Sequence, residues 1–264
     1  MKNKVYSKYG PWALVTGASS GIGEAISKEL ARQGFNIALC ARNTETLNRV
    51  AFQLEREYPI ETKVIAKDLS VLEQVHQLTE ALSSLDLGLV VLNAGYGTSG
   101  DFIDSDLDTE LNMLSLNCIS VAALAHFYGR KFADQKRGGI IMLSSIVAFQ
   151  GSPGVSNYSA SKAYVQNLGE GLHHELKPFN VDVLIAAPGP VKTGFADRAN
   201  TSLNGGDSAT KVAHQIVKAL GKRCTTFPGR LSKLLIFGLR TVPRWGKIRI
   251  MKKVMAKPEH NKAA

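Results

Sequence analysis

The chain has 264 residues, 44% of them hydrophobic, and this length and composition fit one globular α/β domain with a buried core. The N-terminus lacks the apolar run of a secretory signal, and no stretch resembles a membrane-spanning helix, so we predict a cytoplasmic body. Three scattered cysteines without a C-x-x-C pair argue against a disulfide framework or a zinc site, and we expect no metal.

The formal net charge of +10 is concentrated near the end of the sequence. Residues 1–227 contain 22 basic and 21 acidic side chains, whereas residues 228–264 contain ten basic side chains and one acidic side chain. We therefore predict a near-neutral domain over 1–227 and a basic extension over 228–264.

Apolar, strand-like runs alternate with helical patterns along the first of these parts. In chain order, the patterns predict strand 12–16, helix 22–33, strand 36–40, helix 44–58, strand 62–66, helix 71–84, strand 88–92, helix 109–134, strand 139–143, helix 158–177, strand 181–187, helix 207–221 and strand 225–227. Continuous apolar strands joined by helices indicate a parallel sheet with helices on both faces. We therefore expect a single domain with a doubly wound, Rossmann-like α/β fold of three α/β/α layers, with ligands at the carboxyl ends of its strands.

One connection is long and shows little periodicity, the segment 190–206. A long loop in a compact domain is usually functional, and this one would overhang the carboxyl ends of the strands. We predict that it is a substrate lid. With Tyr96, Phe149 and Phe195, it suggests an apolar substrate pocket.

Residues 16–23 read Thr-Gly-Ala-Ser-Ser-Gly-Ile-Gly and join the first strand to the first helix. Glycines let the backbone approach a pyrophosphate, and the helix N-terminus supplies amide donors and a favourable dipole. The segment predicts a dinucleotide site that includes Gly17, Ser19, Ser20, Gly21, Ile22 and Gly23.

Tyr158 and Lys162 are four residues apart in a helical pattern and so share one face. A phenol has an ordinary pKa near 10 and is a slow acid–base group at neutral pH. An ammonium group at about 4 Å would favour the phenolate by about 4 kcal/mol at an effective dielectric of about 20. We therefore predict that Lys162 lowers the pKa of Tyr158 toward neutrality.

Three motifs, in this order, resemble those of the short-chain dehydrogenase/reductase family: G-x-x-x-G-x-G at 17–23, Asn-Ala-Gly at 93–95 and Tyr-x-x-x-Lys at 158–162. The resemblance extends over about residues 11–227. Family members often have Asn-Asn-Ala-Gly, and Leu92 replaces the first Asn here, a departure that we expect to alter how the central sheet is tied together and to leave the chemistry intact. The resemblance implies an oxidoreductase that reduces a ketone or aldehyde carbonyl with a nicotinamide cofactor, or runs the reverse reaction.

The resemblance also implies catalytic roles. Tyr158 would protonate the carbonyl oxygen, and Ser145 would donate a hydrogen bond to it, with Ser144 as the alternative serine. Lys162 would hold the nicotinamide ribose, and Asn117 would position a water that connects Lys162 to solvent.

For the cofactor, the resemblance implies that Thr193 contacts the carboxamide and that Asp68 meets the adenine. The other cofactor contacts that we predict are Leu69, Asn93, Ala94, Gly95, Pro188, Gly189 and Val191.

The end of the second strand indicates which nicotinamide cofactor is bound. NAD-preferring relatives place an acid at the position of Ala41, where it binds the ribose 2′-OH. Here no acid is present and Arg42 follows, so a 2′-phosphate would gain a charge-assisted hydrogen bond worth about 1.5–3 kcal/mol. We predict NADP(H) as the cofactor.

The basic extension has apolar residues at helical spacing among its cations, as in one or two amphipathic helices. Three interpretations stay open: packing against the core or a second subunit, peripheral contact with an anionic membrane through residues 230–257, and nucleic-acid binding. We expect no nucleic acid, because no recognised reader motif accompanies the charge.

Together these features predict an NADPH-dependent reductase for an apolar carbonyl, such as a 3-oxoacyl, lipid or steroid-like compound, that works as a homodimer or homotetramer. It would be cytoplasmic, either free or attached peripherally to a membrane. The alternative is an NAD(P)-binding sensor or scaffold without turnover, attached to a membrane or partner through the basic extension. The complete set of Asn117, Ser145, Tyr158 and Lys162 argues against that alternative.

Overall fold

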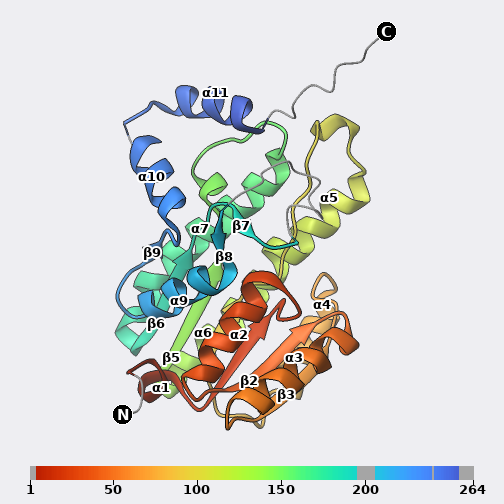
Figure 1. Cartoon of the computed structure of the whole chain (residues 1–264), viewed down its shortest axis with the longest axis vertical. Coiled ribbons are helices and arrows are strands. Elements are labelled where there is room, and N and C mark those ends of the chain that lie inside the picture. Colours follow the sequence, from red (N-terminus) through yellow and green to blue (C-terminus); the bar gives the residue numbers. More distant parts are fainter. Residues whose placement is uncertain (1–3, 195–205, 240, 256–264) are drawn as a thin grey trace.

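The computed structural model describes residues 4–194, 206–239 and 241–255. Its centre is a seven-stranded parallel sheet in the order β3-β2-β1-β4-β5-β6-β9. Figure 1 shows this sheet with helices around it. The strands are β1 (Trp12–Thr16), β2 (Asn36–Ala41), β3 (Thr62–Ala66), β4 (Leu87–Leu92), β5 (Gly138–Leu143), β6 (Val181–Ala186) and β9 (Thr225–Thr226).

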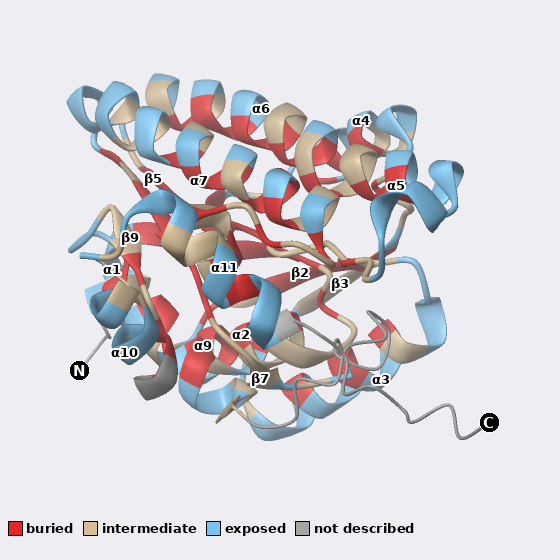
Figure 2. Cartoon of the chain, turned by 90° about the horizontal axis from the view of Figure 1, so that it is seen from above, coloured by how far each residue is buried: buried red, intermediate tan, exposed pale blue. Residues whose placement is uncertain are grey.

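Helices cover both faces of this sheet (Figure 2). One face packs against α2 (Gly21–Arg32), α3 (Thr44–Glu57) and α9 (Ala209–Ala219). The other packs against α4 (Leu72–Ala81), α6 (Ser120–Gln135) and α7 (Ser156–Leu176). The predicted three-layer, doubly wound α/β fold is confirmed.

The sequence of β4 shows why the sheet is buried on both sides. All six residues, Leu-Gly-Leu-Val-Val-Leu, are buried. Successive side chains of a strand point to opposite faces. Leu89 and Val91 accordingly join the apolar cluster on one face, and Val90 and Leu92 join the cluster on the other. Leu92, which departs from the family motif, is thus an ordinary core residue, 2% exposed.

The predicted helix 109–134 is interrupted. It consists of α5 (Leu107–Leu114), a π-helical turn over Ser115–Ile119, and α6. Among the described residues, this continuous 29-residue run is long and apolar enough to cross a membrane, so the prediction that no such stretch exists was wrong by that test. Leu124, Tyr128 and Phe132 on its inner side pack against the sheet, which accounts for its apolar character.

Several short elements were not predicted. Helix α1 (Lys4–Tyr9) precedes β1, and β7 (Val191–Lys192) pairs with β8 (Asp207–Ser208), so α9 begins at Ala209 instead of residue 207. Residues 195–205 of the predicted lid lie outside the described residues. The described 3₁₀ helices are Phe102–Asp104, Ile146–Phe149 and Lys177–Phe179.

The basic extension forms α10 (Arg230–Leu239) and α11 (Arg244–Met255), which lie above the carboxyl ends of the strands in Figure 1. Ser232 is 3% exposed, and its Oγ accepts a hydrogen bond of 2.8 Å from the backbone N–H of Gly189. Met251 is also buried. The extension therefore packs against the domain, while a domain boundary at residue 227 stays a prediction.

Candidate active site

A cavity of about 760 Å³ lies at the carboxyl ends of the strands, between the domain and the two helices of the extension. It is lined by eighteen of the predicted site residues: Gly17, Ser19, Ser20, Gly21, Ile22, Arg42, Asp68, Leu69, Asn93, Ala94, Gly95, Ser145, Tyr158, Lys162, Pro188, Gly189, Val191 and Thr193. The structure brings these residues together from seven segments of the chain. Two other predicted residues, Gly23 and Asn117, do not line the cavity.

The loop between β1 and α2 is held by glycines and by Asn93. Gly17 has φ of 65°, and a Cβ there would lie 2.8 Å from the Asn93 amide nitrogen, so a side chain is excluded. Asn93 donates hydrogen bonds to the carbonyl oxygens of Thr16 (2.9 Å) and Gly17 (3.2 Å). Gly23 permits close packing, because a Cβ added there would overlap the backbone oxygen of Gly17. Asn93 and Gly23 thus shape the loop.

The N-terminus of α2 fits a pyrophosphate. Its first residues, Gly21 and Ile22, line the cavity, and the backbone N–H groups of a first helical turn have no partner within the helix. Those amides and the helix dipole favour an anion at this end. Thr193 lies beside it, since a Cβ on Gly21 would be 3.3 Å from Thr193 Cγ2.

Two cations line the cavity next to the carboxyl ends of β2 and β3. Arg42 follows β2 and lines the cavity with an exposed side chain. Lys67 follows β3 and also lines the cavity, and its Nζ donates a 2.6 Å hydrogen bond to Gln77. The sequence analysis missed Lys67, although the register of parallel strands could have found it: Ala41 pairs with Ala66, so the next residues are neighbours.

Tyr158 is hydrogen-bonded to Ser145, and both line the cavity. The hydroxyl of Ser144 donates a hydrogen bond of 2.9 Å to the backbone oxygen of Lys162. The geometry thus favours Ser145 over Ser144 as the partner of Tyr158.

The prediction that Lys162 lowers the pKa of Tyr158 toward neutrality is wrong. Burial raises the pKa of Tyr158 to about 12, and the hydrogen bond with Ser145 only partly offsets this. Lys162 Nζ donates 2.9 Å to the Leu143 carbonyl and lies 5.8 Å from the centre of the Tyr158 ring. Burial of Lys162, which is 6% exposed, lowers its own pKa to about 8.

Asn117 is fully buried in the π-helical turn between α5 and α6. Its Nδ2 donates to the Tyr96 backbone oxygen (2.9 Å) and to Ser161 Oγ (3.0 Å), and its Oδ1 accepts from the Tyr96 N–H (3.2 Å). The side chain therefore ties the segment after β4 to α7. A Cβ on Gly95 would lie 2.7 Å from Asn117 Oδ1 and 3.4 Å from Lys162 Nζ, so Asn117 lies close to the lysine.

The lowered pKa of Lys162 gives a testable dependence of stability on pH. Between a folded pKa of about 8 and an ordinary value of 10.5, the unfolded chain binds more protons than the folded chain. This group therefore stabilises the fold progressively as pH rises through that window, by at most about 1.4 kcal/mol per pH unit, and gives no such gain below it.

We expect the free energy of unfolding of the wild type, minus that of Lys162→Met, to be larger at about pH 9.5 than at about pH 7 in urea titrations. Taking the difference removes contributions from the cysteines and other tyrosines. A difference that does not change with pH would contradict the lowered pKa.

The extension supplies much of the apolar lining. The residues that it contributes are Leu235, Ile236, Leu239, Ile250, Met251 and Val254. Of the aromatic residues predicted for the substrate pocket, Tyr96 lines the cavity, and Phe195 lies outside the described residues. The prediction for Phe149 was wrong: it is not a lining residue, and its ring packs 5.5 Å from that of Phe227.

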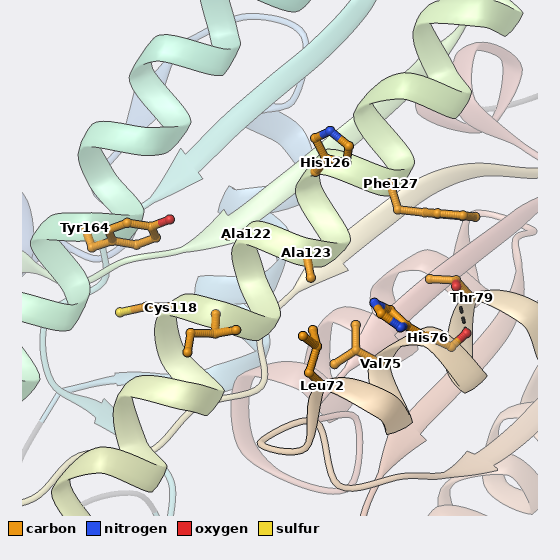
Figure 3. A pocket seen from close by; sticks show the side chains of 11 residues that line it. Leu72, Val75, His76, Thr79, Cys118, Ala122, Ala123, His126, Phe127 and Tyr164 are labelled. Atoms are coloured by element: carbon orange, nitrogen blue, oxygen red, sulfur yellow. Dashed lines mark hydrogen bonds between the residues drawn. The ribbon is translucent and has the colours of Figure 1, made fainter.

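A second hollow, of about 560 Å³, lies on the outer surface of the helical layer formed by α4, α6 and α7 (Figure 3). Figure 3 shows His76 and Leu72 of α4 across from Phe127 of α6, with Tyr164 of α7 beyond Cys118. Phe127 and Tyr164 are 42% and 43% exposed. Within the described residues, no group of three or more His, Cys, Asp or Glu side chains is arranged to hold a metal.

Comparison with known proteins identifies the family of this chain. The family model of the short chain dehydrogenases matches residues 11–204. A very-long-chain 3-oxoacyl-CoA reductase from Anas platyrhynchos is 37% identical over 200 residues, which is 74% of this chain but only 64% of that protein. A 7beta-hydroxysteroid dehydrogenase from Clostridium sardiniense is 30% identical over 86% of this chain and 88% of its own.

Solved structures agree in fold. A structure of a 7beta-hydroxysteroid dehydrogenase superposes with a TM-score of 0.86 at 27% identity, over 94% of this chain and 98% of that one. A short-chain dehydrogenase from Sphingobium yanoikuyae in complex with NADPH gives a TM-score of 0.78 at 26% identity, over 89% and 96% of the two chains. The chain described here therefore belongs to the short-chain dehydrogenase family of oxidoreductases.

Proposed function

We propose that the protein is an NADPH-dependent oxidoreductase that reduces the carbonyl group of an apolar substrate, with Tyr158 as the proton donor. The observation that carries this proposal is the hydrogen-bonded pair of Ser145 and Tyr158, which lines one cavity together with the glycine loop. A sensor or scaffold has no need of such a pair beside a dinucleotide site, and the oxidoreductase names of the relatives do not favour that alternative.

The residues of the cavity suit carbonyl reduction. The bound nicotinamide dinucleotide would supply the hydride. Tyr158, a neutral phenol at physiological pH because its pKa is about 12, donates its proton to the carbonyl oxygen. Ser145 donates a hydrogen bond to the same oxygen and stabilises the charge that develops there. The resulting tyrosinate recovers a proton from solvent through Lys162, whose pKa of about 8 suits proton transfer near neutral pH.

Two features support the preference for NADPH. No acid occupies position 41, and Arg42 with Lys67 gives this edge of the cavity two cations. An anionic 2′-phosphate is therefore attracted to this edge of the cavity and not repelled by it.

In the proposed mechanism, Asn117 is a positioning residue for Lys162.

The apolar lining from α10 and α11 supports a long or bulky hydrophobic substrate. The relatives named for 3-oxoacyl and hydroxysteroid chemistry make these the first two classes to test. The experiment follows the consumption of NADPH by the full chain with 3-oxoacyl thioesters, oxo-steroids and small water-soluble ketones. NADPH binding without turnover of any carbonyl would favour the sensor.

We also propose that the protein is a homo-oligomer that buries the hollow between α4, α6 and α7. Its apolar rim, which includes the exposed Ile119, Phe127 and Tyr164, is costly to leave in water. Phe127→Arg should convert the oligomer to a smaller species in light-scattering measurements of mass, because it places an unpaired charge in the contact. Phe52→Arg, at an exposed site on α3, is the control. A wild-type monomer, or a variant with unchanged mass, would overturn this prediction.

A further inference from the structure

We infer that α10 and α11, together called the cap, form a docking surface for an anionic lipid bilayer and admit apolar substrate from it into the cavity. The docking itself is independent of catalysis, whereas the admission of substrate rests on the proposed function.

The inner side of the cap belongs to the cavity. On α10, Leu235, Ile236 and Leu239 line it. On α11, the lining residues have the same spacing and are Ile250, Met251 and Val254. Residues at i, i+1 and i+4 lie on one side of a helix. Both helices therefore present one apolar side to the space above Tyr158.

The outer side of the cap exposes large apolar groups as well. Leu234 and Phe237 of α10 are 68% and 76% exposed, and Trp245 of α11 is 64% exposed. In Figure 2, which is viewed from the cap side, much of the outward surface of α11 is exposed. A helix packed on its own domain has no need of apolar groups on both sides, so the outer set is suited to a second apolar environment.

The charge of the cap identifies that environment. Helices α10 and α11 contain seven Lys or Arg and no Asp or Glu. Within the described part of the cap, these cations make no ion pair. A symmetric contact between two caps would bring seven cations against seven, which is unfavourable. Cations beside exposed Trp and Phe instead match anionic headgroups above an acyl layer.

The cavity opens at the cap. Ile250 and Val254 line the cavity and yet are 39% and 50% exposed, so they lie where it meets the surface. Trp245, Arg249 and Lys253 follow one another at four-residue spacing on α11, and the Arg249 guanidinium lies 5.1 Å from the centre of the Trp245 ring. An apolar molecule leaving a bilayer at this surface would meet the apolar lining directly.

The test is co-sedimentation of the full chain with phosphatidylcholine vesicles that contain or lack phosphatidylserine, at low and high salt. We expect binding to the anionic vesicles only, and release by salt. Trp245→Ser/Arg249→Glu should weaken binding more than tenfold, because one Lys or Arg near an anionic surface alone contributes about fivefold, or about 1 kcal/mol.

The chain offers a matched control for this variant. Phe52 and Arg56 on α3 form the same pair of aromatic and arginine four residues apart, with Phe52 65% exposed and the guanidinium 5.9 Å from the ring centre. Phe52→Ser/Arg56→Glu should bind vesicles like the wild type. Circular dichroism and thermal unfolding establish that each variant folds.

Docking is overturned if the wild type does not bind anionic vesicles, or if both double variants lose binding equally. It is also overturned if Trp245→Ser/Arg249→Glu changes the mass of the oligomer and not the binding to vesicles. The substrate route is read separately. With a carbonyl dissolved in anionic vesicles, Trp245→Ser/Arg249→Glu should be more than fivefold less active than the wild type. With a small water-soluble ketone, the two proteins should be equally active. If the variant matches the wild type on both substrates, the substrate route is overturned. Absence of turnover with every carbonyl overturns the proposed function and leaves the vesicle result standing.

Discussion

Tyr158→Phe should lower kcat for carbonyl reduction by about 10²–10⁴-fold while leaving the binding of NADPH unchanged. The substitution removes one oxygen and its proton and keeps the ring that lines the cavity. Positioned general acids contribute a factor of this size, and Ser145 alone cannot replace the proton. The measurement pairs steady-state kinetics with a fluorescence titration of NADPH.

Tyr164→Phe provides the control for this experiment. Tyr164 is on the same helix but lines the outer hollow and not the cavity, so its loss should leave kcat unaltered. A Tyr158→Phe enzyme with near-normal kcat would show that another group protonates the carbonyl. Loss of NADPH binding in the variant would mean that the phenol serves the cofactor instead.

The sheet and the dinucleotide loop could be predicted because their signals are local. The central strands β4 and β5 are runs without polar side chains, and all their residues are buried. The glycines at 17, 21 and 23 mark a turn whose backbone geometry excludes side chains, and the positive φ of Gly17 and Gly21 agrees with it. Spacing within one strand or helix therefore carried both predictions.

The rest depends on partners far away in the sequence. The π-helical turn brings Asn117 to Tyr96 and Ser161, and no periodicity within 109–134 indicates that these partners exist. Helix α1 is similarly anchored through Tyr9, which is 2% exposed and hydrogen-bonds to Asp182.

The pKa prediction failed for a related reason. Four-residue spacing places Lys162 on the same side of the helix as Tyr158. It does not reveal that the Leu143 carbonyl accepts a hydrogen bond from the Lys162 amine, or that both groups are buried.

The position of the basic extension was likewise open, because its apolar residues suit the core, a partner and a membrane equally well. Only the structure places Leu235 and Met251 in the cavity.

Arg42→Ala should reduce the preference for NADPH over NADH by about tenfold to a hundredfold, through a higher KM for NADPH with little change in kcat. Arg42 lines the cavity at the end of β2 and is remote from the reacting carbonyl, so its loss affects ground-state binding only. Lys67 should retain part of the preference, because it lies beside Arg42 on the neighbouring strand. Arg49→Ala is the control, since that arginine pairs with Glu24 and does not line the cavity.

Ala41→Asp in the Arg42→Ala background should then favour NADH, because the new carboxylate accepts a hydrogen bond from the ribose 2′-OH and repels a 2′-phosphate. A wild type that prefers NADH, or an Arg42→Ala variant that loses both cofactors equally, would refute the role of this edge of the cavity.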